Sequence, residues 1–121
     1  MASSSARIAL LAGLVLCGGE RSLLGAELYG KPLRGLTAVA VREAVGNPAR
    51  FAGLEIRVAG TNAGPEGRPE LKEGDAVLPI RTDGSYALPE RLNGALLAAE
   101  GSLKEEGGAV VFVATGVEIT R

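Results

Sequence analysis

The clearest pattern in the chain is an alternation of apolar and polar residues over residues 54–61, LEIRVAGT. Leu54, Ile56 and Val58 fall on one side of an extended chain, and the charged residues between them fall on the other. A period of two is typical of a strand with one buried face. This stretch therefore predicts a half-buried strand.

Four further stretches have the composition of strands and are separated by turn residues: residues 70–72, 76–82, 95–103 and 109–119. Residues 95–103 are rich in Ala and Leu, so their composition is also compatible with a helix. Residues 109–119 are β-branched and apolar on both faces, which predicts a long central strand. Pro79 cannot donate a hydrogen bond to a neighbouring strand, so it predicts an edge position or a bulge.

One short helix is predicted ahead of these strands. Residues 37–46 place Val41 and Ala44 on one helical face, and Asn47-Pro48 ends the helix because proline cannot continue it. Five strands with closely spaced turns predict a mainly β fold, a small five-stranded OB-type barrel with one short N-terminal helix. The predicted core consists of Leu54, Ile56, Val58, Leu78, Ile80, Leu97, Val111, Val113 and Val117.

The N-terminus has the three parts of a secretory signal peptide. A polar start that carries Arg7 is followed by nine apolar residues and then by small residues that end at Gly19. The apolar run is too short for a membrane span, which needs about 20 residues. We therefore predict that residues 1–19 are a signal peptide, and that the protein is periplasmic or secreted without a stable membrane span. Cleavage after Gly25 or Ala26 is an alternative.

Cys17 raises the possibility of a lipoprotein, because bacterial lipoproteins carry a lipidated cysteine at the end of the apolar run. The residue before that cysteine is small in such proteins, whereas it is Leu16 here, which argues against lipidation. Residues 20–36 have no clear period and are predicted to be a lead-in segment. Residues 37–121 are predicted to form a single OB-fold domain, and we expect it to be a monomer.

The balance of charges argues against a nucleic-acid partner. Lys and Arg total 13, Asp and Glu total 14, and the cations are scattered singly along the chain. Proteins that bind nucleic acids need clustered cations, and single-strand binders add aromatic stacking platforms. Only 3% of the residues are aromatic. The sequence therefore predicts no nucleic-acid binding.

The residue inventory also removes several kinds of chemistry. The chain has no His, and its one Cys lies in the predicted signal peptide. Nucleophilic catalysis by a Ser–His or Cys–His pair, and zinc or copper sites built from His or Cys, need side chains that the mature chain lacks. We therefore predict no cofactor, no metal and no enzymatic activity.

Carboxylates are the one set of reactive groups that remains. Glu66, Glu70, Glu73 and Asp75 lie close together in the sequence around one loop. Calcium loops usually have denser and more regular Asp and Asn spacing, so these residues predict a solvated turn. A hydrolase that uses two carboxylates as acid and base stays open as an alternative.

Several short motifs follow one another along the chain: Tyr29-Gly30-Lys31-Pro32-Leu33, residues 37–43, Asn47-Pro48, Phe51, Gly53, Leu88-Pro89, Gly94, Glu100-Gly101 and residues 113–118. Their order resembles an exported bacterial OB-fold family known as a domain of unknown function, over roughly Tyr29 to Ile119. The resemblance implies an OB fold and export. Members usually carry a Cys-rich segment ending in Gly-Cys-Trp after the first strand. Residues 62–72 hold neither Cys nor Trp here, so thiol or metal chemistry does not carry over.

Three residues are predicted to bind a ligand: Arg57, Arg81 and Tyr86. They would line the face formed by the first three strands, where OB folds bind their ligands, and would suit a small anion or an oligosaccharide. Ordinary surface charge beside a capping tyrosine is the alternative. We therefore predict an exported, non-enzymatic binding module for an unknown small ligand or envelope protein. A structural module of the envelope that binds a partner by strand addition is a second alternative.

Overall fold

The structure is a computed structural model, and it describes residues 26–121. The predicted signal peptide, residues 1–19, lies outside the described residues. The described part is mainly β, as predicted. Its elements are β1 (Glu27–Gly30), α1 (Val41–Gly46), the 3-10 turn η1 (Pro48–Phe51), β2 (Ile56–Thr61), β3 (Glu70–Glu73), β4 (Ala76–Thr82), β5 (Leu96–Glu106) and β6 (Ala109–Thr120).

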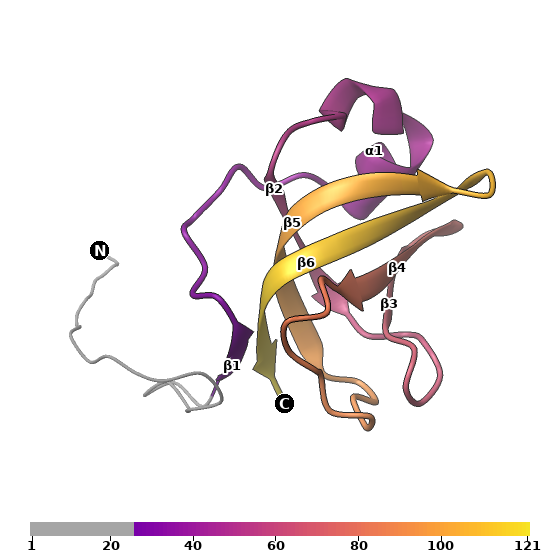
Figure 1. Cartoon of the computed structure of the whole chain (residues 1–121). Coiled ribbons are helices and arrows are strands. Elements are labelled where there is room, and N and C mark those ends of the chain that lie inside the picture. Colours follow the sequence, from indigo (N-terminus) through magenta and orange to yellow (C-terminus); the bar gives the residue numbers. More distant parts are fainter. Residues whose placement is uncertain (1–25) are drawn as a thin grey trace, which may run out of the picture.

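The strands form one curled half-barrel sheet in the order β2-β5-β6-β4-β3 (Figure 1). Neighbouring strands are antiparallel except β4 and β6, which are parallel. An isolated bridge between Asn62 and Leu71 connects the end of β2 to β3. The sixth strand, β1, pairs with the C-terminal half of β6. The sequence pattern predicts five strands, whereas the structure has a sixth, β1, within the predicted lead-in segment.

β6 is the central strand that its composition predicts, because it pairs with β1, β4 and β5. The β5–β6 ladder is interrupted once: Glu100 pairs with Gly116 and Gly101 pairs with Ala114, so that Thr115 is an extra residue. A Cβ added at Gly101 would overlap the backbone oxygen of Val113. The strands therefore approach each other at this bulge as closely as only glycine allows.

Six of the nine predicted core residues are buried, namely Ile56, Val58, Leu78, Ile80, Leu97 and Val117. Leu54 was predicted wrongly, since it precedes β2 and is 52% exposed. In the first half of β6 the fully buried residues are Phe112 and Ala114, and Val111 and Val113 lie on the other face and are half-buried. The extra residue Thr115 then shifts the buried positions to Val117 and Ile119, so one period of two does not describe the whole strand.

α1 lies over one end of the curled sheet, where Val41 and Ala44 are buried (Figure 1). It is shorter than predicted, because residues 37–39 are extended and Ala38 forms a parallel bridge with Arg57 at the edge of β2. The helix ends at Gly46, and the N–H of Asn47 caps it by donating to the carbonyl of Glu43. Within residues 26–121, no helix is long and apolar enough to cross a membrane.

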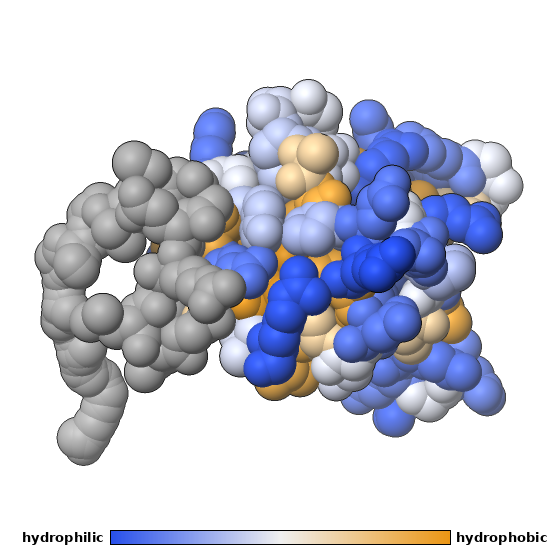
Figure 2. All heavy atoms as spheres, turned by 90° about the horizontal axis from the view of Figure 1, so that it is seen from below, coloured by the Kyte–Doolittle hydropathy of each residue, from blue (hydrophilic) through white to orange (hydrophobic). Residues whose placement is uncertain are grey.

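Arginine and glutamate side chains form pairs over the described surface. Arg34 Nη2 lies 2.6 Å from Glu55 Oε1, and Arg91 Nε lies 3.1 Å from Glu66 Oε2. Figure 2 shows one face of the molecule, on which apolar surface is interspersed among hydrophilic residues. Because many guanidinium groups have a carboxylate beside them, their charge is largely balanced locally.

Residues 31–37 connect β1 to the edge of β2, and we call this segment the strap. It crosses the face of β6 and β5 that points away from the core, with Lys31 against Gly116 and with the N–H groups of Arg34 and Leu36 on Glu100. At its start the N–H of Lys31 donates to the carbonyl of Thr115 at 2.9 Å, and at its end the carbonyl of Thr37 accepts from the N–H of Arg57 at 2.9 Å. The predicted lead-in segment is therefore part of the folded structure from β1 onward.

Candidate functional site

The structure brings two of the three predicted ligand-binding residues together. Arg81 and Tyr86 line one cavity of about 310 Å³, with the end of β4 on one side and residues 86–90 of the β4–β5 connection on the other. Gly67 and Pro69, from the β2–β3 loop, complete its wall. We call it the β4 cavity. Arg57 is not part of this cavity.

Arg81 is engaged by a carboxylate of its own chain. Its guanidinium makes two parallel hydrogen bonds to Glu106 at the end of β5, one of them 2.8 Å from Nη1 to Oε1. These bonds raise the pKa of Arg81 and lower the pKa of Glu106. An anionic ligand in the β4 cavity would therefore compete with Glu106 for this cation.

Tyr86 is held by both its ring and its hydroxyl. The hydroxyl donates to the carbonyl of Ala114 at 2.7 Å. The ring lies so close to Gly30 that a Cβ there would be 2.7 Å from a ring carbon. Burial, with a smaller contribution from the charge of Asp83, raises the pKa of Tyr86 to about 12. The hydroxyl thus stays protonated at neutral pH and fixes the wall of the β4 cavity to β6.

The β2–β3 loop is held at its base by a residue that sequence analysis overlooked. Asn62 is buried at the end of β2, and its Oδ1 accepts from the N–H groups of Gly64 at 3.0 Å and Glu70 at 2.9 Å. Its Nδ2 donates to the carbonyl of Leu92 at 2.9 Å. The signal in the sequence was an asparagine two residues before a glycine, which is typical of an Asx turn.

The four carboxylates around this loop do not gather at one point. Glu66 pairs with Arg91, while a carboxylate oxygen of Glu73 accepts from the N–H of Arg42 at 3.0 Å. Within residues 26–121, no group of three or more His, Cys, Asp or Glu residues is placed to hold a metal ion. Glu66 and Glu73 therefore make separate surface contacts.

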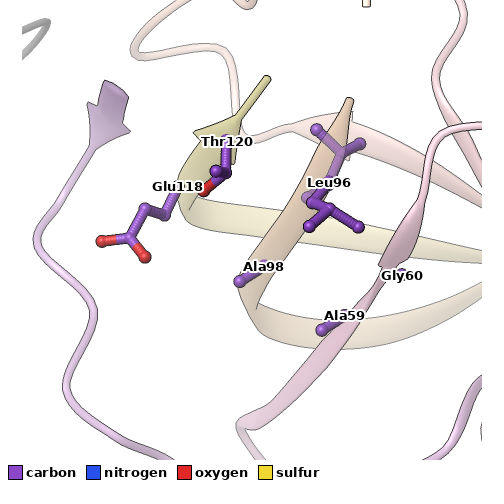
Figure 3. Close-up of a pocket in the computed structure, with 7 residues that line it drawn as sticks. Ala59, Gly60, Leu96, Ala98, Glu118 and Thr120 are labelled. Carbon is purple, nitrogen blue, oxygen red and sulfur yellow. The ribbon is translucent and has the colours of Figure 1, made fainter. Parts of the chain in front are cut away.

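A second cavity, of about 240 Å³, lies on the outer face of β2, β5 and β6 (Figure 3). Small residues form its floor, including Ala59 and Ala98, and Leu96 stands beside them with 53% of its surface exposed. Glu118 and Thr120 of β6 line the opposite side. We call this surface the apolar groove.

Glu100, on β5, is the buried charged residue of the described chain, with only 1% of its surface exposed. Its Oε1 accepts from the N–H of Arg34 at 2.6 Å, and its Oε2 accepts from the N–H of Leu36 at 2.8 Å. Gly35, between them, has a φ of 74°. Successive N–H groups that converge in this way form an anion-binding nest.

Arg57, the third predicted ligand-binding residue, lies beside this nest. Its Nη1 is 3.7 Å from Glu100 Oε2. Burial by itself raises the pKa of Glu100, but the N–H donors of Arg34, Leu36 and Gly35, with the charge of Arg57, outweigh it and hold that pKa below its ordinary value. The sequence signal for Glu100 was an isolated charge within an apolar strand.

Three distant stretches of the chain meet at this point, which we call the strap junction: residues 31–36, Glu100-Gly101 and Thr115-Gly116. Thr115 Oγ1 donates to the carbonyl of Glu100 at 3.2 Å. A Cβ added at Gly116 would overlap the backbone oxygen of Lys31. These stretches carry several of the motifs on which the family resemblance rests.

Comparison with known proteins adds no family: no family model, no curated protein and no solved structure matches the chain. The resemblance described above stays a prediction.

Proposed function

We propose that the protein is an exported OB-type module that binds a small ligand and catalyses no reaction. The support for an OB-type barrel is topological. The five strands lie in the order β2-β5-β6-β4-β3, and the Asn62–Leu71 bridge connects β3 back to β2, so that they form a ring. Within this ring β4 and β6 are parallel. A five-stranded, partly open barrel is the architecture of the OB fold. On this proposal β1 and the strap are additions to the outside of the barrel.

The β4 cavity is the proposed ligand site, and the observation that carries it is its mixed lining. Pro69 and Leu88 offer apolar surface, whereas Thr82 and Glu90 offer polar atoms. Apolar walls with a few polar groups are typical of small-molecule sites, which begin at about 300 Å³. Because Arg81 is already paired with Glu106, a neutral polyhydroxyl ligand such as an oligosaccharide fits better than an anion.

An NMR titration of the ¹⁵N-labelled protein would test this proposal. The probes are maltotriose, chitotriose and inorganic phosphate. We expect saturable shifts of the amides of Thr82, Ala87 and Glu90 with an oligosaccharide, and none with phosphate. The variant Ala87→Trp fills the cavity and should abolish the shifts. Its matched control, Ala59→Trp, adds the same bulk to the apolar groove and should preserve them.

The absence of shifts with all three probes would argue against a saccharide site, and equal shifts in Ala87→Trp would place binding elsewhere. Export has a separate test, because N-terminal sequencing of the protein from its native host should begin near Glu20. The predicted lack of nucleic-acid binding is tested by fluorescence anisotropy with labelled single-stranded DNA and RNA at physiological salt.

The apolar groove supports a second candidate, a module that binds an envelope protein. Leu96 is a large apolar side chain that is half exposed beside the small residues Ala59 and Ala98. Exposed apolar surface of this kind is typical of an interaction site. Capture from an envelope extract should recover a partner with the wild-type chain and lose it with Leu96→Arg. Recovery of the same partner with both chains would exclude the groove.

A further inference from the structure

We infer that the strap can detach locally from the sheet and that the hydrogen bonds to Glu100 hold it in place. Its release exposes part of the β2 edge and lengthens the apolar groove. The inference concerns residues 31–37 and does not depend on the ligand of the β4 cavity.

The first support is the way in which the strap is fastened. The N–H groups of Arg34 and Leu36 both donate to the one carboxylate of Glu100, at 2.6 and 2.8 Å. A charged acceptor makes each of these bonds stronger than a bond to a neutral carbonyl. The backbone in the middle of the strap is therefore held by a single side chain of β5, and the Arg34 side chain adds an exposed ion pair with Glu55.

The second support is the lack of burial along the strap itself. None of residues 31–37 is buried, and only Leu33 and Leu36 are even half-buried. The segments on either side are fixed: Gly30 pairs with Gly116 of β6, and Val39 belongs to the core. A segment with little buried apolar surface between two anchored ends is the kind that opens locally while the rest stays folded.

The third support is the position of the strap over the outer face of β2, β5 and β6, next to the apolar groove. Ala98, Glu118 and Ala59 line the apolar groove. Glu100, Gly116 and Arg57 lie two residues further along the same strands, so each is on the same face as its groove counterpart. The strap lies over Glu100, Gly116 and Arg57. Opening the strap would expose these residues next to the groove and would free the N–H of Arg57, which now donates to the carbonyl of Thr37.

The charged groups around Glu100 favour the closed strap at neutral pH. Arg57 of β2 faces the carboxylate of Glu100, and the N–H donors of the strap face it from the other side. The Arg34 side chain is turned to Glu55, which precedes β2. On β6 the nearest charge on this face is Glu118, one row away in the groove. The ionised form of Glu100 therefore favours the closed strap.

Limited proteolysis measures strap opening directly, because trypsin can cut the Arg34–Gly35 bond only when the strap is free. The test variant is Glu100→Gln, which keeps the shape of the side chain but turns one acceptor into a donor. The control is Glu55→Gln, which removes the exposed partner of Arg34. We expect cleavage after Arg34 to be at least about tenfold faster in Glu100→Gln and within about twofold of wild type in Glu55→Gln.

Cleavage after Arg57 and Arg81, inside strands, needs unfolding of the sheet and should stay far slower than cleavage after Arg34 in both variants. An unchanged rate after Arg34 in Glu100→Gln would overturn the inference, and so would cleavage after Arg34 that is no faster than cleavage after Arg57 and Arg81, since the strap would then open only together with the whole fold. If Glu100→Gln fails to fold, amide hydrogen exchange of the wild-type protein decides. The amides of Arg34 and Leu36 should exchange at least about tenfold faster than those of Ala99 and Ile119, and equal protection would refute local opening.

Discussion

One arginine–glutamate pair lies at the strap junction and another beside the β4 cavity, and the two pairs differ in the segments that they connect. Arg81 and Glu106 meet in a bidentate arrangement at 2.8 Å, but both side chains are nearly half exposed. Arg57 and Glu100 are 3.7 Å apart, but the Glu100 side chain is only 2% exposed and also accepts two N–H groups from a distant segment. We expect the shorter pair to contribute less to stability, because water screens it and it connects no further segment.

Removal of the buried carboxylate should have the largest effect. Glu100→Ala leaves the N–H groups of Arg34 and Leu36 and the charge of Arg57 without their acceptor. We expect a loss of about 3 kcal/mol in the free energy of unfolding, the range for breaking a buried charged contact. Urea unfolding at pH 7 measures it. A loss below about 1 kcal/mol would mean that water replaces the carboxylate and that the junction matters little.

A bulkier residue under the strap should have the next largest effect. Gly116→Ala adds a Cβ that would overlap the backbone oxygen of Lys31, so the strap must shift. We expect a loss of about 2 kcal/mol in the free energy of unfolding. Gly46→Ala is the matched control, because nothing lies within 4 Å of its added Cβ, and it should be neutral or slightly stabilising. Equal losses would show that the close contact is not the cause.

In the β4 cavity, the tyrosine hydroxyl should matter more than the exposed ion pair. Tyr86→Phe keeps the ring against Gly30 but removes the hydrogen bond to the carbonyl of Ala114. We expect thermal or urea unfolding to report a loss of about 1 kcal/mol. No loss would mean that water satisfies the carbonyl in the variant.

The smallest effect on the free energy of unfolding is expected for the Arg81–Glu106 pair, although its two groups are the closer ones. Glu106→Gln removes the carboxylate that Arg81 contacts on the exposed surface. Water and salt screen exposed pairs, so the free energy of unfolding in urea should change less in this variant than in Tyr86→Phe at physiological salt. A loss as large as that of Tyr86→Phe would reverse the comparison between the two regions.

The sequence predicted the elements whose pattern is local. The alternation in residues 56–61 and the β-branched run of β6 identified their strands, and Asn47-Pro48 marked the end of α1. The short strand β1 has no period of its own and depends on its pairing with β6. The change of the buried face at Thr115 also depends on pairing, because the extra residue is extra only relative to β5.

The candidate site was predictable to a similar extent. Arg81 and Tyr86 stand five residues apart in the sequence and line one cavity, whereas Arg57 is on another strand and contacts Glu100. Glu100 was visible as an isolated charge in an apolar run. Its partners were not, because they are backbone N–H groups of residues 64 and 66 positions away, and backbone groups leave no mark in a sequence.

The pH dependence of stability tests the account of the strap junction most directly. The pKa of Glu100 is lowered in the folded protein, so its ionised form stabilises the fold above the ordinary Glu pKa of about 4.3, and this contribution is lost as the pH falls through the lowered pKa. The measurement is the difference in unfolding free energy between wild type and Glu100→Gln. We predict that it is largest at pH 7 and shrinks as the pH falls below the ordinary Glu pKa of about 4.3. A difference that stays constant over this range would contradict the role of the ionised carboxylate.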